Sequence, residues 1–484
     1  MKREDWIFLL LCLLLGGVAE LAFFHAMPAV SFIVFVAALY WVFFWRFRRY
    51  AFANRRIGYL LLTCVWVLAA SNAIYGEGML QVLNLLVIPA LFVIHIVLIT
   101  AKGRMAWYRP VFLIRVLSRL FGGLLYNSRC LKAVRLQWLE KAGSGAYRPL
   151  VKVGLGLLLA LPFLLVVTLL LSSADTQFGR LVGELPNWLL RVSLLEGLFR
   201  TVVVLAVASA LFGFLQHVRT REQTEQEREA AAVRWTWDGI MIATLLLAMN
   251  AVYLLFAAVQ FQYFFGGAPQ DLTYAEYARR GFAELVVVMV INLTMLAGVL
   301  TYTRMQGGLK LFVRLLLTLF VAATAVMLVS AFQRLSLYEA AYGFTLLRLL
   351  AHSFMLLLGV LLAYTLARVW LEKLPLRHFY LIAGLLYYTG LSVADLNGIV
   401  AWQNVERFHG TGKIDVYYMG SLSYAGTSAL IDVYKEKPDV PQLRTVLVER
   451  KNGLLQEEKH WQSWSLAKRN VDEKLQRLQF GGQP

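Results

Sequence analysis

The sequence predicts an all-α fold: a polytopic helical membrane protein with about eleven transmembrane helices and a small helical C-terminal tail outside the membrane. Three observations support this prediction. The 484 residues are 59% hydrophobic and 16% charged, whereas soluble chains are usually about 45–50% apolar and about 25% charged. Long apolar runs recur at short intervals, and lysines and arginines gather in alternate loops. Together they exclude a soluble enzyme, a secreted disulfide scaffold and a disordered chain.

Eleven apolar runs are the predicted spans. A chain in lipid must satisfy its own backbone polar groups, so these runs should be helices, and about 20 residues cross a hydrocarbon core of about 30 Å. The first run is longer than a usual signal peptide core and a second follows at once, so we interpret it as an uncleaved span. The predicted spans are 6–25, 29–45, 57–75, 79–100, 150–172, 198–216, 238–264, 282–303, 311–332, 345–367 and 377–396.

The basic residues set the predicted orientation. With the N-terminus in the cytoplasm, the cytoplasmic segments carry 28 lysines and arginines, the opposite loops and helix ends carry 7, and the tail from Glu406 carries 12. Lysine and arginine accumulate in cytoplasmic loops. An odd number of spans then leaves the tail extracytoplasmic. The net charge of +18 is therefore a signal of topology and calls for no nucleic-acid partner.

Four segments organise the chain: a four-helix N-terminal membrane segment (1–100), a basic amphipathic cytoplasmic loop (101–149), a seven-helix membrane domain (150–408) and a helical extracytoplasmic tail (409–484). The basic loop mixes apolar and basic residues at helical spacing, which is typical of helices that lie on a membrane surface. The expected partner is therefore the lipid bilayer, with anionic lipid at the cytoplasmic face. Docking of an unknown protein partner is the alternative.

The sequence carries no motif for a metal, a cofactor or catalysis. Three cysteines, Cys12, Cys64 and Cys130, are too few for a disulfide framework, and none forms a C-x-x-C pair. Cys12 and Cys64 lie in apolar runs and should be small buried side chains. No H-E-x-x-H, phosphate-binding loop or serine-centred elbow occurs, so we predict no catalytic residue, no metal and no cofactor.

Charged side chains at bilayer depth form the first candidate site. Each costs roughly 2.5–3.5 kcal/mol on insertion scales and therefore needs a reason. Arg348 and His352 stand four residues apart, on one face of a helix, and the charges lie toward the predicted outer leaflet. The functional interpretation is a polar cavity open outward, with Arg348 paired to an acid; the alternative is a set of structural pairs between helices. The candidate cavity residues are Glu284, Arg348, His352, Asp395 and Glu339.

Two predicted outer loops, 272–282 and 335–344, resemble each other. Both contain tyrosine and glutamate and then Gly-Phe at the start of a helix. The likeness indicates either duplicated helical hairpins, which transporter folds often show, or a chance similarity of aromatic interfacial loops. The candidate signature residues of these loops are Tyr274, Glu276, Tyr277, Arg280 and Tyr338.

Several stretches carry a family resemblance. LTYAEYARRGF at 272–282, LYEAAYGFTLLRL at 337–349 and the segment 395–407 are similar to an uncharacterised bacterial family of multi-pass membrane proteins, a domain of unknown function. The resemblance covers roughly 235–430. It extends to the tail at 415–430, where AGTSAL stands in place of the family's acidic-Ala-Val-Pro-Ala-Leu run. It implies a multi-pass protein of the bacterial cell membrane and implies no activity.

The sequence is compatible with three functions. One is a transporter or receptor-like module that handles a small solute or a lipid-like molecule in an outward-facing polar cavity. Another is a non-catalytic membrane scaffold or sensor component that docks partners through the tail and the basic loop. The third is a membrane-embedded enzyme acting on lipid or cell-wall precursors, which is least favoured because no catalytic spacing is present.

Overall fold

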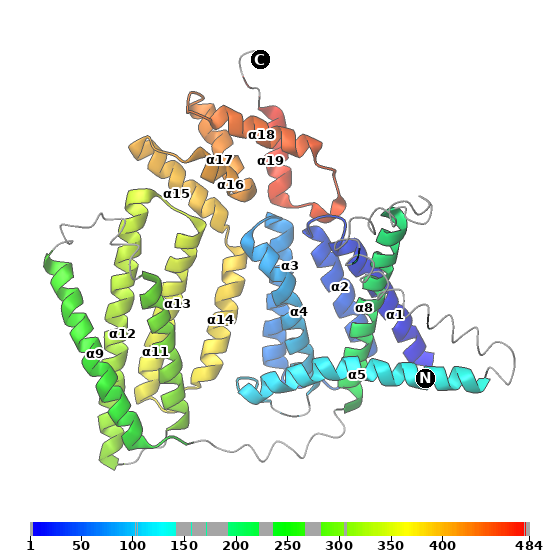
Figure 1. Ribbon diagram of the computed structural model, residues 1–484, viewed down its shortest axis with the longest axis horizontal. Helices are drawn as coiled ribbons and strands as arrows, with labels where there is room; N and C mark the ends of the chain where they lie inside the picture. The colour runs from blue at the N-terminus through cyan, green and yellow to red at the C-terminus, as the bar shows by residue number, and fades with distance from the viewer. Residues whose placement is uncertain are drawn as a thin grey trace.

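The computed structural model describes residues 3–101, 103, 105–141, 156, 171, 192–221, 236–266, 282–303, 307–478 and 480. In this part of the chain two helical bundles stand side by side, and a smaller group of helices covers one end of both (Figure 1). We call the two groups of long helices the first and second bundles. The covering group, residues 396–480, is called the cap.

Each group has a hydrophobic core of its own. The first bundle consists of α1 (Arg3–Phe23), α2 (Val30–Arg46), α3 (Arg55–Tyr75), α4 (Met79–Thr100), α5 (Pro110–Lys141) and α8 (Val192–Arg221). The second consists of α9 (Gly239–Gly266), α11 (Phe282–Tyr302), α12 (Gly307–Tyr342) and α13 (Leu346–Trp370). The cap consists of α15 (Leu396–Thr411), α16 (Val416–Ser421), α17 (Ser423–Glu436), α18 (Leu443–Gln456), the 3₁₀ turn η2 (Trp461–Ser463) and α19 (Leu466–Arg477).

Helix α14 (Leu376–Val393) lies between the two bundles and leads into the cap. Tyr388 Oη of α14 donates to Asn84 Oδ1 of the first bundle at 2.9 Å. One residue earlier, the Tyr387 hydroxyl lies 2.9 Å from Ser353 Oγ of the second bundle. Adjacent helical residues point in different directions, so α14 forms hydrogen bonds with both bundles at once.

The predicted membrane class agrees with the helices. Eight described helices are long and apolar enough to cross a membrane, and α14 with α15, which meet at a 60° bend, would make a ninth. The 17-residue α2 is apolar but shorter. Predicted span 150–172 lies outside the described residues, apart from Gly156 and Leu171. The all-α polytopic prediction is therefore confirmed, and the count of eleven spans is not.

The outer faces of the long helices are apolar. Leu86, Leu255 and Leu347 are each about 70% exposed, at 73%, 70% and 69%. A soluble protein rarely exposes contiguous apolar surface on this scale, whereas helices in lipid must do so. The interior is also apolar, and Cys12 and Cys64 are buried and free, as predicted.

Helix α12 is longer than the predicted span 311–332. It continues to Tyr342, so most of the predicted outer loop 335–344 is helical. No glycine or proline interrupts the sequence between Leu309 and Tyr342. The helix stops at Gly343, which has a φ of +83° and whose N–H donates to Glu339 O at 2.8 Å. A glycine in the left-handed region is a common end of a helix.

The cap and the N-terminus lie at opposite ends of the molecule (Figure 1). Helix α5 runs across the end of the first bundle at which α1 begins, crosswise to the long helices (Figure 1). The predicted tail began at residue 409, but α15 already contributes Val400, Ala401 and Phe408 to the cap core. The cap therefore includes a helix that the sequence analysis placed with the membrane domain.

Candidate functional site

A cavity of about 190 Å³ lies where the two bundles and the cap meet. Its walls come from the turn between α3 and α4, the first turns of α13, the break between α14 and α15, and the cap helices α17 and α19. For scale, an engineered cavity of about 150 Å³ holds a benzene molecule. The junction therefore has room for a small solute.

The break between α14 and α15 places Asp395 in the cavity wall. Asp395 is the N-cap of α15, and its Oδ1 accepts the N–H of Gly398 at 2.8 Å. An aspartate at this position satisfies one of the free N–H groups of the first turn. Asp395 was a predicted cavity residue, and it lines this cavity.

Glu77 faces the same cavity from the turn between α3 and α4. Tyr424 Oη of the cap donates to Glu77 Oε1 at 3.1 Å, and Ser423 Oγ donates to the backbone carbonyl of Glu77 at 3.1 Å. These bonds join the first bundle to the cap. The sequence analysis did not single out Glu77, because an acidic residue in a turn is ordinary.

Tyr424 is buried and has carboxylates near it. Burial raises the pKa of its phenol well above the ordinary value of 10, and the Glu77 carboxylate raises it further. Glu457 and Asp472 act in the same direction. The Tyr424 hydroxyl therefore resists deprotonation first because it is buried and then because carboxylates lie nearby.

The other predicted cavity residues lie elsewhere. Glu339 Oε2 and His352 Nδ1 are 3.1 Å apart, between α12 and α13, with side chains only 9% and 13% exposed. Arg348 donates to the carbonyl of Gly343, and its guanidinium lies 4.2 Å from the centre of the Tyr338 ring. Glu284 is exposed in the first turn of α11. None of these four lines the cavity that contains Asp395.

The predicted loop signature is only partly visible. Tyr274, Glu276, Tyr277 and Arg280 lie outside the described residues. Tyr338 lies in the last turns of α12, beneath Arg348. The comparison of the two loops as a repeat therefore stays a prediction.

Two of the family-like segments contact each other, which the sequence analysis did not foresee. Phe344 N donates to Asn404 Oδ1 at 3.1 Å, and Asn404 Nδ2 donates back to Phe344 O at 2.8 Å. Two residues along, Leu346 N donates to Tyr418 Oη at 2.8 Å. These bonds fix the cap to the second bundle beside the cavity.

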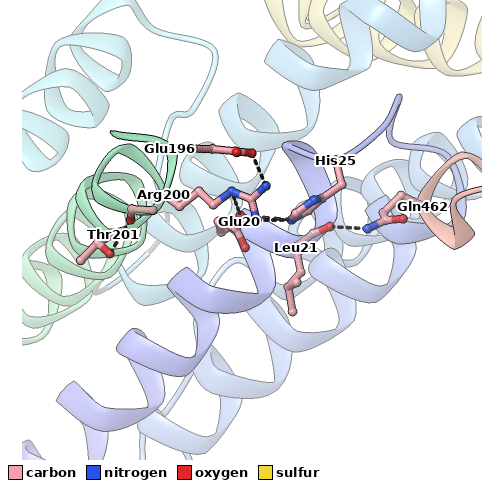
Figure 2. A network of polar contacts seen from close by, with 8 residues as sticks. Glu20, Leu21, His25, Glu196, Arg200, Thr201 and Gln462 are labelled. Atoms are coloured by element: carbon pink, nitrogen blue, oxygen red, sulfur yellow. Dashed lines mark hydrogen bonds and ion pairs between the residues drawn. The ribbon is translucent and has the colours of Figure 1, made fainter. Parts of the chain in front are cut away.

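A second polar network lies at the cap end of the first bundle (Figure 2). Glu20, 8% exposed, accepts from His25 Nε2 at 3.1 Å and lies 3.5 Å from Arg200 Nε. Arg200 also pairs with the exposed Glu196 in the preceding turn of α8. Gln462 of the cap donates to Leu21 O at 3.1 Å, one residue from Glu20. The network joins α1, α8 and the cap.

Metal binding finds no support in the described residues. No group of three or more histidine, cysteine, aspartate or glutamate side chains there could hold a metal ion. The carboxylates and amides around the 190 Å³ cavity could instead bind an organic solute through charge and hydrogen bonds.

The helical bundles, their apolar outer faces and the cap define a polytopic helical membrane protein. Within this class, a family model described as a domain of unknown function, DUF4153, matches residues 62–433, and the chain belongs to that family. Neither a curated protein nor a solved structure matches the chain. The matched region runs from α3 to α17 and includes every wall of the cavity except the one that α19 supplies.

Proposed function

We propose that this integral membrane protein binds a small solute in the cavity beneath the cap, as a transporter or a receptor-like module. The observation that carries the proposal is the cavity's position at a broken helix between two bundles. Transporters commonly place their substrate where a membrane helix is interrupted at the interface of two structural units. Asp395, at the end of that break, supplies a charged group to such a site.

We further propose that the cavity opens to the extracytoplasmic side of a bacterial cell membrane. The excess of lysine and arginine in the segments on the N-terminal side supports this orientation. On that side α5 carries exposed apolar residues such as Ile114, Phe121 and Leu125, at 65%, 60% and 62%. This pattern suits a helix lying on a leaflet that contains anionic lipid.

A labelling experiment tests the orientation. Asn452→Cys on the exposed face of α18 should react with a membrane-impermeant maleimide on intact cells, in a background where Cys130 is changed to alanine. Arg56→Cys at the start of α3 should react only after the cells are opened. The reverse pattern would overturn the orientation.

Filling the cavity tests the function. Purified protein is screened against a library of small solutes by thermal unfolding, and hits are repeated with Ala425→Phe, which places a ring in the cavity wall. Stabilisation by a hit should disappear in this variant and persist in Asn452→Phe, whose site is exposed and outside the cavity. Hits that survive in Ala425→Phe would contradict the proposed site.

A scaffold or sensor role is the second candidate, and one observation favours it. The side chains of Glu339 and His352 contact each other, so this buried pair joins α12 to α13 without needing a ligand. If the protein is a scaffold, a partner that co-purifies with the full chain should be lost when residues 101–149 are deleted. A full chain that co-purifies with no partner would count against this role.

A further inference from the structure

The polar lining of the 190 Å³ cavity has one sign of charge. It contains the carboxylates of Glu77 and Asp395 and the amides of Gln81 and Asn397, and no lysine, arginine or histidine stands among the described residues that line it. The ammonium of Lys474 donates to Ser428 Oγ, in the cavity wall, at 2.8 Å. Asp432 Oδ2 lies 3.0 Å from the same ammonium, so this positive charge is already paired.

The Gln81 side chain is a separate indication of a ligand. Gln81 is only 8% exposed and lines the cavity, yet within the described residues its side-chain amide forms no hydrogen bond. An amide without a protein partner can donate to and accept from a group that enters the cavity. Its Oε1 lies so close to Gly78 that a Cβ there would come within 2.3 Å. Gly78 therefore makes the space that the amide occupies.

The two carboxylates also keep free acceptor capacity. Glu77 uses Oε1 for the Tyr424 hydroxyl, and Asp395 uses Oδ1 for the N–H of Gly398. In the described part of the chain, Oε2 of Glu77 and Oδ2 of Asp395 accept no hydrogen bond and form no ion pair. An ionised carboxylate can accept several hydrogen bonds. Asp395 is exposed and Glu77 is half-buried, so the attraction of an added cation is stronger than in water mainly on the Glu77 side.

We infer that the cavity binds a small solute carrying an ammonium group, held between the carboxylates of Glu77 and Asp395 with the Gln81 amide as a further hydrogen-bonding group. This inference rests on the proposed solute-binding function and specifies its ligand. Burial is the main cause of the raised pKa of Tyr424, and the further rise caused by Glu77, Glu457 and Asp472 agrees with negative potential at the same wall. The apolar side chains of Leu346 and Leu350 complete the wall and suit a short hydrocarbon chain.

Three probes of equal chain length and different charge test the inference: butylammonium, butyramide and butyrate. Binding to the detergent-purified full chain is measured by calorimetry at pH 7. Butylammonium should bind at least about tenfold more tightly than butyramide, because a hydrogen bond to a charged group is stronger than one between neutral groups. Butyrate should not bind.

Variants locate the probe. Asp395→Asn keeps a good N-cap residue for α15, and Glu77→Gln keeps an acceptor for Tyr424; each should weaken butylammonium about tenfold or more. Glu449→Gln removes a carboxylate of the cap outside this cavity and should leave the affinity unchanged. Unchanged melting temperatures of the unliganded variants establish that they are folded. Because the two substitutions are independent, weaker binding in either folded variant is enough to place the probe in this cavity.

The outcomes separate the inference from the proposed function. Preferential binding of butyramide or butyrate that Ala425→Phe abolishes would overturn the ammonium inference and leave solute binding intact. Butylammonium binding that neither carboxylate variant weakens would also overturn the inference. Failure of all three probes and of the solute library, with Ala425→Phe behaving as wild type throughout, would overturn both.

Discussion

The cap is joined to the two bundles in different ways. At the second bundle, Asn404 exchanges two hydrogen bonds with the backbone of Phe344, and Tyr418 accepts the N–H of Leu346. At the first bundle, the joint beside the cavity is made through side chains, with Tyr424 and Ser423 on Glu77. The bonds of Asn404 fix both backbone groups of Phe344, whereas the bond of Tyr424 ends on a side-chain carboxylate and can be exchanged for one to a ligand. The cavity thus lies beside a bond that a ligand can replace.

The largest expected effect comes from the second-bundle joint. Asn404→Ala removes its bonds to both the N–H and the carbonyl of Phe344, which leaves two part-buried backbone groups without partners. We expect a loss of about 2–4 kcal/mol, measured as lower thermal stability and faster proteolytic release of the cap. Glu406→Ala, on the exposed side of the same helix, should change neither. Equal losses in the two variants would show that the bonds of Asn404 to Phe344 do not hold the cap to the second bundle.

The ionic network beneath the first-bundle joint should give an intermediate effect. Among the described residues, Arg200→Ala leaves the buried Glu20 with His25 as its remaining partner. The change should cost about 1–3 kcal/mol, because an uncompensated buried charge is penalised. Glu196→Ala removes the exposed partner of the same arginine, and should cost less than about 1 kcal/mol. Thermal unfolding of the two variants side by side measures the difference, and equal losses would show that the burial of Glu20 does not matter.

The smallest effect is expected at an exposed ionic cluster far from the cap. It gives a reference value for surface charges, against which the effects at the two joints of the cap can be compared. Lys310, through a hydrogen bond and its charge, and Arg314 hold the pKa of Glu372 below its ordinary value of 4.5. A depressed folded-state pKa adds stability above the unfolded value and loses it as the pH falls through the folded value. Glu372→Gln should therefore lower the melting temperature slightly at pH 7 and by less at pH 3. A larger drop at pH 3 would contradict the assignment.

Hydropathy predicted most of the fold because lipid imposes it. Ten of the eleven predicted spans coincide with described helices, since a long apolar run such as 79–100 has few alternatives in a bilayer. The end of α12 was misplaced because aromatic and charged residues at 335–342 read as a loop, while the local signal that ends the helix is Gly343.

The candidate site was predicted only in part. Asp395 was found because a carboxylate next to an apolar run is costly, and the structure explains its presence as a helix cap in a cavity wall. Glu77 and Tyr424 meet across 347 positions of sequence. No periodicity carries that information, because the contact depends on how the cap folds back over the first bundle. A glutamate in a turn does not by itself predict such a partner.

The hydrogen bonds of α14 connect the bend at Asp395 to both bundles. Tyr388 ties α14 to the first bundle, Tyr387 ties it to the second, and Tyr75 donates to the carbonyl of Val393 at its last turn. If either bundle tilts relative to the other, α14 is pulled by one set of bonds and held by the other. The next break in the chain is the bend at Asp395, so the helix would give way there. Because Asp395 lines the 190 Å³ cavity, a tilt of the bundles would widen or narrow that cavity.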